Sequence, residues 1–130
     1  MPDKISFSDF QKLDIRVGTV VEASVPEWSH WVMKLKVDLG LEIGERTILA
    51  GIMKFYQPKE LVGKQFIFVV NLEPKKIGPK EPDGTQNFST GMMLAACRPM
   101  SKKQETGNKD GEKPILFSPW EKLPSGAKIR

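Results

Sequence analysis

Alternating apolar and polar positions predict that this chain is built mainly from β-strands. In segment 32–39, Leu35, Val37 and Leu39 alternate with lysine and aspartate, so one face of the strand should be buried and the other solvated. The β-branched residues of segment 15–25 indicate a strand that precedes it. Three further apolar segments complete a set of five expected strands: 46–50, 65–71 and 92–97.

Glycine, proline and capping residues mark the connections between these strands. Gly40 and Gly44 indicate a hairpin turn between the second and third strands. Pro58 suits the first turn of a short helix between the third and fourth strands. Ser8, with Gln11 three residues later, has the spacing of a capping box and predicts a helical turn with Ser8 as its N-cap.

Three strands, a short helix and two strands follow one another in the order of the OB fold, a five-stranded barrel. A small barrel with a different connection is the alternative. The length of 130 residues suits one domain, so residues 1–130 are expected to form one all-β barrel with N- and C-terminal extensions. Segment 101–114 is expected to be a mobile loop or hairpin tip, and segments 115–117 and 123–130 to return to the barrel.

Charge is distributed unevenly along the chain, which carries 20 basic and 16 acidic side chains. Residues 1–70 hold nine of each, whereas residues 71–130 hold eleven basic and seven acidic side chains, and this difference accounts for the net charge of +4. Such asymmetry favours nucleic acid or another anionic surface as a partner. A solvated basic tail on a soluble protein explains the same charge.

Candidate binding side chains concentrate between the fourth and fifth expected strands. Asn71 ends an apolar run, Lys75 and Lys76 follow it, and Ser89 and Met92 open the next run. Two cations, an amide, a hydroxyl and a thioether are therefore expected to meet at one mouth. The two cations suit the binding of a polyanion. The set contains no acid–base pair and no group of metal ligands, so we expect it to hold the polyanion and not to cleave it.

Each lysine in the candidate set has a functional and an ordinary explanation. Lys75 and Lys76, and Lys34 on the polar face of its strand, would pair with phosphates as flexible point charges, or would be simple surface lysines. Lys54 precedes two aromatic residues and would contact the backbone beside a stacked base. The first of those aromatics, Phe55, is expected to anchor the short helix instead.

The uncharged candidates are equally open to two explanations. Asn71 would read a base edge or a ribose hydroxyl, or would cap the end of its strand. Ser89 would bind phosphate or act as a cap. Met92 would lie against a splayed base or pack in the core.

Two tryptophans lie in the segment before the second strand. Trp28 and Trp31 are costly to expose, so a stacked base, a partner subunit or the chain's own barrel is expected to cover them. His30 is the only histidine, which excludes a histidine-based metal cluster and Ser/His catalysis. The carboxylates have no spacing for acid–base work, so we expect no enzyme, no cofactor and no metal site.

The sequence also indicates the compartment. Cys97 is the only cysteine, so it cannot form an intrachain disulfide and is expected to be a buried or half-buried thiol in a reducing environment. The longest aliphatic and aromatic run is five residues, far below the roughly 20 that a spanning helix needs. No signal peptide is evident. We expect a cytoplasmic protein without a membrane partner.

Several short segments, in order and spread over nearly the whole chain, resemble one known family. They are residues 13–18 (LDIRVG), 51–56 (GIMKFY), 71–77 (NLEPKKI), 89–92 (STGM) and 124–128 (PSGAK). They resemble the tRNA-binding domains found at the C-terminus or in the β subunit of methionyl-tRNA synthetases, and most of all the free-standing dimeric form. The resemblance implies a non-catalytic OB fold that binds the outer corner of tRNA by shape, and it supports Lys34 and Met92 as contacts.

Two features depart from the family pattern. Trp31 stands where members often carry a contacting lysine, and loop 78–88 is longer than the usual short turn. A sister family of small secretion-associated chaperones shares the fold and the opening LDIR motif but binds peptides. Peptide binding is therefore the alternative function.

Apolar residues near the chain ends predict self-association. Phe7, Phe10, the segment 115–117 and Trp120 supply apolar surface that a five-stranded barrel does not need. A small domain gains stability when it buries such surface against a second copy. We expect a homodimer formed through residues 1–12 and 115–130, with tRNA as the ligand and an aminoacyl-tRNA synthetase as a candidate partner.

Overall fold

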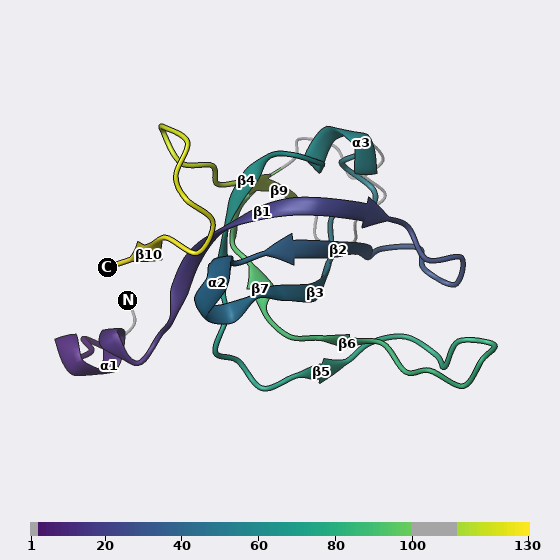
Figure 1. Cartoon of the computed structure of the whole chain (residues 1–130), viewed down its shortest axis with the longest axis horizontal. Coiled ribbons are helices and arrows are strands. Elements are labelled where there is room, and N and C mark those ends of the chain that lie inside the picture. The colour runs from purple at the N-terminus through teal and green to yellow at the C-terminus, as the bar shows by residue number, and fades with distance from the viewer. Residues whose placement is uncertain (1–2, 100–111) are drawn as a thin grey trace.

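The computed structural model describes residues 3–99 and 112–130, and its main feature is a curved antiparallel sheet (Figure 1). The sheet has the strand order β3–β2–β1–β4–β7. These strands span Glu45–Ala50, Met33–Asp38, Ile15–Ser24, Gln65–Val69 and Met92–Met93, respectively. The barrel is nearly closed between β3 and the segment before β7, where the backbone N–H of Thr90 donates to the carbonyl of Thr47 at 3.0 Å. The predicted all-β, five-stranded barrel is confirmed.

β1 is the longest strand and organises the barrel. It pairs with β2 and β4, and its first residues also pair with β10 (Lys128–Ile129). A Cβ atom at Gly18, in the middle of β1, would overlap the side chains of Val37 and Leu39. Only glycine at this position therefore leaves room for the core side chains of the neighbouring strand β2 to pack against β1. The pairing of β10 agrees with the expected return of segment 123–130 to the barrel.

The core contains the apolar members of the alternating pattern. Leu35 and Val37 from β2 are fully buried, together with Leu39 just after it, while Lys34 and Lys36 lie on the other face. Phe68 of β4 is the largest fully buried side chain. Each buried side chain of this size contributes roughly 1.5 to 3 kcal/mol to folding. The period-two pattern thus placed the barrel interior correctly.

The N-terminal helix α1 (Phe7–Gln11) begins two residues earlier than its expected cap implied. Its N-cap is Ser6, whose Oγ accepts a hydrogen bond from the backbone N–H of Asp9 at 3.1 Å. The prediction of Ser8 as the cap was wrong. Its hydroxyl instead lies 3.0 Å from that of Ser6. Both serines have the right chemistry, and the helix start decides between them.

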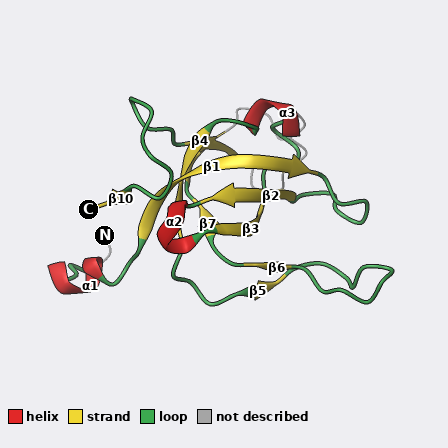
Figure 2. Cartoon of the chain, viewed as in Figure 1, coloured by secondary structure: helices red, strands yellow, loops and turns green. Residues whose placement is uncertain are grey.

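Two short helices connect strands of the barrel (Figure 2). The predicted hairpin turn between β2 and β3 contains one helical turn, α2 (Gly40–Ile43), flanked by Gly44 with a φ of +85°. α3 (Pro58–Leu61) begins with proline, as predicted, and is closed by a capping box of Gln57 and Glu60. α3 lies between β3 and β4, which is the expected position of the short helix.

Two ribbons, each of two strands, extend from the barrel. β5 (Lys75–Lys76) pairs with β6 (Phe88–Ser89), and β8 (Ala95–Pro99) pairs with β9 (Glu112–Leu116). The predicted fifth strand is therefore divided, because β7 belongs to the barrel and β8 to a ribbon. Of the expected loop 101–114, all but residues 112–114 lie outside the described residues.

The second ribbon corrects the prediction for the thiol. Cys97 lies in β8 and is exposed, because the ribbon stands outside the barrel and offers the side chain no core to enter. A hydrogen bond with the carboxylate of Glu112 raises the pKa of the Cys97 thiol, since it disfavours the thiolate. None of the helices within residues 3–99 and 112–130 has the length and apolar content to span a bilayer.

Candidate nucleic-acid interface

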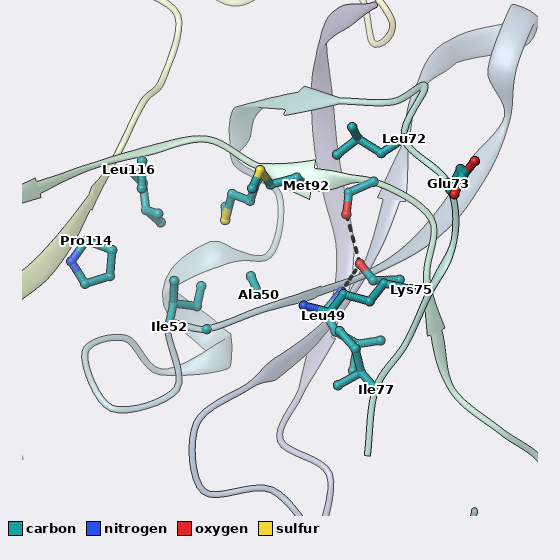
Figure 3. A pocket seen from close by; sticks show the side chains of 15 residues that line it. Leu49, Ala50, Ile52, Leu72, Glu73, Lys75, Ile77, Met92, Pro114 and Leu116 are labelled. Carbon is teal, nitrogen blue, oxygen red and sulfur yellow. Dashed lines mark hydrogen bonds between the residues drawn. The ribbon is translucent and has the colours of Figure 1, made fainter. Parts of the chain in front are cut away.

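A groove of about 660 Å³ runs along β5, β6 and β7 (Figure 3). Most of its lining is apolar, and its charged members are Glu73 and Lys75. The apolar lining comes from three regions of the chain: Leu49, Ala50 and Ile52; Leu72, Ile77, Met92 and Met93; Ala95, Pro114 and Leu116. The groove therefore joins the barrel wall to the foot of the β8–β9 ribbon.

Three of the predicted site residues meet in this groove. Lys75 lies opposite Ser89 in the β5–β6 register, and both line the groove with Met92. The side chain of Met92 is 52% exposed and faces the groove (Figure 3). A cation and a thioether thus share one depression, as expected for the mouth.

The β5–β6 ribbon separates Lys76 from this groove. Lys76 lies opposite Phe88, and side chains alternate between the two faces of a strand, so this pair occupies the other face of the ribbon. Phe88 lines a second depression of about 550 Å³ together with Lys34, Arg46 and Gln86. The single mouth predicted from the sequence is therefore two neighbouring faces.

The lysines of these two faces are not neutralised by carboxylates. Within the described part of the chain, Lys34, Lys75 and Lys76 have no ion-pair partner. By contrast, Lys36, two positions along β2, lies 3.4 Å from Glu22. Three ammonium groups at the ribbon and β2 are thus available to an anionic ligand.

Ser89 has a role within the barrel. Its hydroxyl is buried, accepts a hydrogen bond from the backbone N–H of Leu49 at 3.0 Å and donates to the carbonyl of Gly91 at 2.9 Å. These bonds join β3 to the segment between β6 and β7, where the barrel closes. A phosphate contact by Ser89 stays a prediction.

Asn71 is also held by the fold. Its Oδ1 accepts from the backbone N–H of Asp14 at 2.9 Å, and its Nδ2 donates to the carbonyl of Lys12 at 2.6 Å. The side chain fastens the segment before β1 to the end of β4, and it is not among the residues that line the Lys75 groove. This matches the capping explanation, and a base contact by Asn71 stays a prediction.

Lys54 lies in the turn after β3, and its neighbour Tyr56 supports a ribbon. The hydroxyl of Tyr56 donates to the carbonyl of Pro114 at 2.8 Å, and the Nζ of Lys113 lies 5.7 Å from the centre of its ring. Tyr56 therefore anchors β9 to the barrel, while Phe55 is half-buried. An RNA contact by Lys54 stays a prediction.

Sequence reasoning missed Arg46, which borders the second depression. Its Nη1 donates to the carbonyls of Val70 at 2.6 Å and Thr90 at 3.1 Å. The guanidinium thus joins the residues that follow β4 and β6, at the base of the β5–β6 ribbon. Its polar position at the start of an apolar strand is the signal that could have identified it.

A second charged cluster lies where α2 and the C-terminal segment meet β1. Arg16 is buried, its Nε lies 2.7 Å from Oδ1 of Asp14, and its Nη2 lies 3.2 Å from Oε1 of Glu42. Its Nη1 also donates to the carbonyl of Gly126 at 3.3 Å. Hydrogen bonds to Asp14 and then Glu42 raise the pKa of Arg16, and the bond from Arg16 lowers the pKa of Glu42.

The two tryptophans have different environments. The ring of Trp28 packs on Gly78, where any Cβ would overlap it, and its Nε1 donates to Oε1 of Glu81 at 3.1 Å. Of the three explanations, coverage by the chain itself therefore holds for Trp28. Trp31 meets Trp28 edge to face, with ring centres 5.9 Å apart, and remains 50% exposed.

The described residues also bear on metal chemistry. Between positions 3 and 99 and from 112 onward, no three His, Cys, Asp or Glu side chains are grouped so as to hold an ion. The site consists of lysines, an arginine, amide and hydroxyl groups and apolar walls, with one carboxylate in each depression, Glu73 and Glu45. Such a set can bind an anionic polymer through its phosphates and contact its bases.

Comparison with known sequences identifies relatives of nearly the whole chain. Residues 15–128 match the family model described as "Putative tRNA binding domain". The methionine–tRNA ligase of Pyrococcus horikoshii is 40% identical over 126 residues, which are 97% of this chain and 14% of that enzyme. The ligase of Clostridium tetani is 36% identical over 128 residues, or 98% and 17% of the two chains. The chain thus spans about one-seventh of the length of such relatives.

Several solved structures resemble nearly the whole chain, and two of them serve as examples. The chaperone CsaA of Bacillus anthracis has a TM-score of 0.76 at 30% identity and covers 98% of this chain and 100% of its own. A MetRS-related protein of Pyrococcus horikoshii has a TM-score of 0.75 at 34% identity and covers 99% and 100%. These likenesses confirm the predicted OB-fold barrel and the resemblance found in the sequence motifs.

Proposed function

Because this chain belongs to the tRNA-binding domain family, whose domain is a non-catalytic RNA-binding module, we propose that it binds tRNA by shape through the β5–β6 ribbon and its two faces. The observation that carries the proposal is the placement of Lys75 and Lys76. They project to opposite faces of one exposed ribbon and lack carboxylate partners among the described residues. Lys34 and Arg46 extend the basic surface on one side.

The chemistry of this surface fits phosphate recognition. Ammonium groups pair with phosphates without a fixed geometry, so a spread of lysines follows the backbone of a folded RNA and reads its shape. About three to five neutralised phosphates would give a slope of log K against log salt of roughly −2 to −4.5. The apolar groove beside Lys75 then provides room for sugar and base surfaces.

Assembly with other chains belongs to the same proposal. We infer that the module assists a methionyl-tRNA synthetase, because its curated relatives are methionine–tRNA ligases that carry a matching segment. A cytoplasmic location stays a prediction. Under both hypotheses, the protein acts where tRNA is aminoacylated.

A homodimer is also part of the proposal. Phe7 is 71% exposed and stacks on Phe10, and these residues line a depression of about 330 Å³ between α1 and β10. Trp120 is 99% exposed. A second copy that covers these rings would bury surface that the barrel leaves in water.

Light scattering tests the dimer without removing β9 or β10. A doubly substituted chain, Phe7→Ser with Trp120→Ser, should be monomeric, while the unchanged protein is dimeric at tens of micromolar. A mass of 14.6 kDa for the unchanged protein would refute the dimer. In that case the rings are simply exposed.

Peptide binding is the second candidate, and the apolar lining of the groove favours it. Ten of its lining residues have apolar side chains: Leu49, Ala50, Ile52, Leu72, Ile77, Met92, Met93, Ala95, Pro114 and Leu116. One structural neighbour of this chain is titled a chaperone. A groove of this kind would accept apolar side chains of an extended polypeptide.

Filter binding with three ligands separates these functions. The protein is titrated with unfractionated tRNA, an unstructured single-stranded RNA and an unfolded polypeptide, each at several salt concentrations. We expect the highest affinity for tRNA, with a steep dependence on salt. Equal or higher affinity for the single strand would indicate a general OB-fold RNA binder, and preference for the polypeptide would establish the chaperone function instead.

A further inference from the structure

We propose that the exposed face of Trp31 is a stacking surface for an unpaired RNA base at the rim of the Lys75 groove. The inference rests on the proposed function and adds a specificity-determining residue to it. Trp31 was left with three explanations by the sequence, and the structure distinguishes it from Trp28. The ring of Trp28 packs against Gly78, whereas Trp31 is 50% exposed and therefore accessible to a ligand.

The ring of Trp31 is supported from behind. Trp28 meets it edge to face, and Trp28 is itself fixed by Gly78 and by the hydrogen bond to Glu81. The carboxylate of Glu81 also accepts from Nδ2 of Asn87 at 2.7 Å, so its charge is engaged by two donors. Trp31 therefore contacts Trp28 on one side while half of the residue stays exposed, as in the aromatic platforms of single-strand binders.

The backbone of Trp31 is held on both sides. Its N–H donates to Oγ of the buried Ser29 at 3.2 Å, and its carbonyl accepts from the N–H of Met53 at 3.2 Å. Ser29 also bonds both backbone groups of Val32. A platform that is ordered before the ligand arrives loses little conformational entropy on binding.

Gly51 connects the platform to the groove. It lines the groove that contains Lys75 and Ile77, and a Cβ placed on it would meet one side-chain atom, Cδ1 of Trp31, at 4.0 Å. Trp31 therefore stands at this rim, and the missing side chain of Gly51 leaves the approach to its ring open. A base that lies on the indole would therefore be next to the groove that holds Lys75.

The lysine of the adjoining groove favours a nucleic acid over a peptide as the occupant. Lys75 lines that groove and has no carboxylate partner among the described residues. An indole at the rim of such a groove suits a ligand that combines a flat aromatic ring with a phosphate. Every base has such a ring, so the platform would select unpaired nucleotides without selecting one base.

Three variants test the platform by tRNA filter binding and by tryptophan fluorescence. Trp31→Leu removes the aromatic face but keeps apolar bulk, and Trp31→Phe keeps a ring but removes the indole emission. Leu41→Ala is the control, because Leu41 is fully exposed and lies outside the groove lining. Circular dichroism establishes that each variant is folded.

The expected results separate stacking from charge. Trp31→Leu should weaken tRNA binding by about fivefold to a hundredfold, with an unchanged salt slope because no charge is lost. Trp31→Phe should keep most of the affinity and lose the fluorescence quench that tRNA causes in the unchanged protein. Leu41→Ala should change neither, and a fully paired RNA duplex should quench little.

Several outcomes would overturn the proposal. Wild-type affinity in folded Trp31→Leu, or a full tRNA-induced quench in Trp31→Phe, would exclude stacking on Trp31. The quench comparison still decides if Trp31→Leu does not fold. If Trp31→Leu loses polypeptide binding but keeps tRNA binding, the ring belongs to a peptide site. Absence of salt-dependent tRNA binding by the unchanged protein would instead refute the proposed function itself.

Discussion

Two charged regions of this molecule use their basic side chains in opposite ways. Arg16 is buried, and its guanidinium forms ion pairs with Asp14 and Glu42 and a hydrogen bond to a backbone carbonyl. Lys75 and Lys76 stand on an exposed ribbon and have no carboxylate partner in the described part of the chain. The first region stabilises the barrel, and the second is available to a ligand.

The difference shows why net charge is a weak guide to a binding site. Arg16 and Lys75 count equally in the total of +4, yet one is neutralised by its own fold. The relevant quantity is the charge left after internal pairing. Four substitutions, in order of decreasing effect, test whether the two regions are as separate as the structure indicates.

Replacement of Arg16 should have the largest effect, and on stability alone. Arg16→Leu leaves Asp14 and the Gly126 carbonyl without their donor and should lower the free energy of unfolding by roughly 2 to 3 kcal/mol. Urea denaturation measures this loss. Arg16→Lys keeps the positive charge but lacks the planar guanidinium, so it should recover only part of the lost free energy of unfolding. Weaker tRNA binding by folded Arg16→Leu would contradict the separation.

Replacement of the ribbon lysines should have the reverse effect. Lys75→Ala with Lys76→Ala should change stability by about 0.5 kcal/mol or less. Its tRNA affinity at 0.1 M salt should fall by roughly tenfold per lost phosphate contact, and the salt slope should become shallower by about 0.9 per contact. Salt-dependent filter binding measures both.

The matched control removes the same charge from another face. Lys59→Ala with Lys64→Ala alters two exposed lysines in and just after α3, on the far side of the barrel from the ribbon (Figure 1). It should leave the tRNA affinity nearly unchanged. An equal loss in the two double variants would show that binding responds to total charge and not to the ribbon.

Asn71→Ala tests the border between the regions. Loss of its hydrogen bonds to Asp14 and Lys12 should lower the free energy of unfolding by about 1 kcal/mol, with no change in salt slope. Asn71→Asp keeps an acceptor for the Asp14 N–H and should lose less. A fall of more than about fivefold in the tRNA affinity of either folded variant would add a base contact to its structural role.

The smallest effect concerns pH. The bond from Arg16 lowers the pKa of Glu42 below its ordinary value of 4.5, so the charged form is favoured in the folded state. The resulting stabilisation is complete above pH 4.5 and is lost as the pH falls through the lower, folded-state pKa. Glu42→Gln should therefore differ from the unchanged protein by a constant amount at pH 5 to 7, and the two should converge as the pH falls through the lowered pKa of Glu42. Urea denaturation over the whole of this pH range would show parallel curves if the pair does not form.

The barrel could be predicted because its signals are local. Alternation in β2 and the β-branched composition of β1 fix which side chains face inward, and Pro58 marks the helix. The ribbons could not be predicted in the same way. β5 and β6 contain two residues each and pair across the loop between them, so their register depends on tertiary contacts.

The candidate site was predicted in composition but not in geometry. The sequence placed Lys75, Ser89 and Met92 together, as the structure does. It could not show that the ribbon separates Lys76 from Lys75, because the side of a strand on which a residue lies depends on the pairing. Nor could it show that Ser89 is buried, since a serine at a strand end suits either environment.

The contact between Trp28 and Gly78 makes two distant segments depend on each other. The largest side chain and the smallest residue fill one space, where any Cβ at position 78 would overlap the indole. A substitution at Gly78 is therefore expected to act far along the chain: it displaces Trp28, and through Trp28 the ring of Trp31, whose centre lies 5.9 Å away.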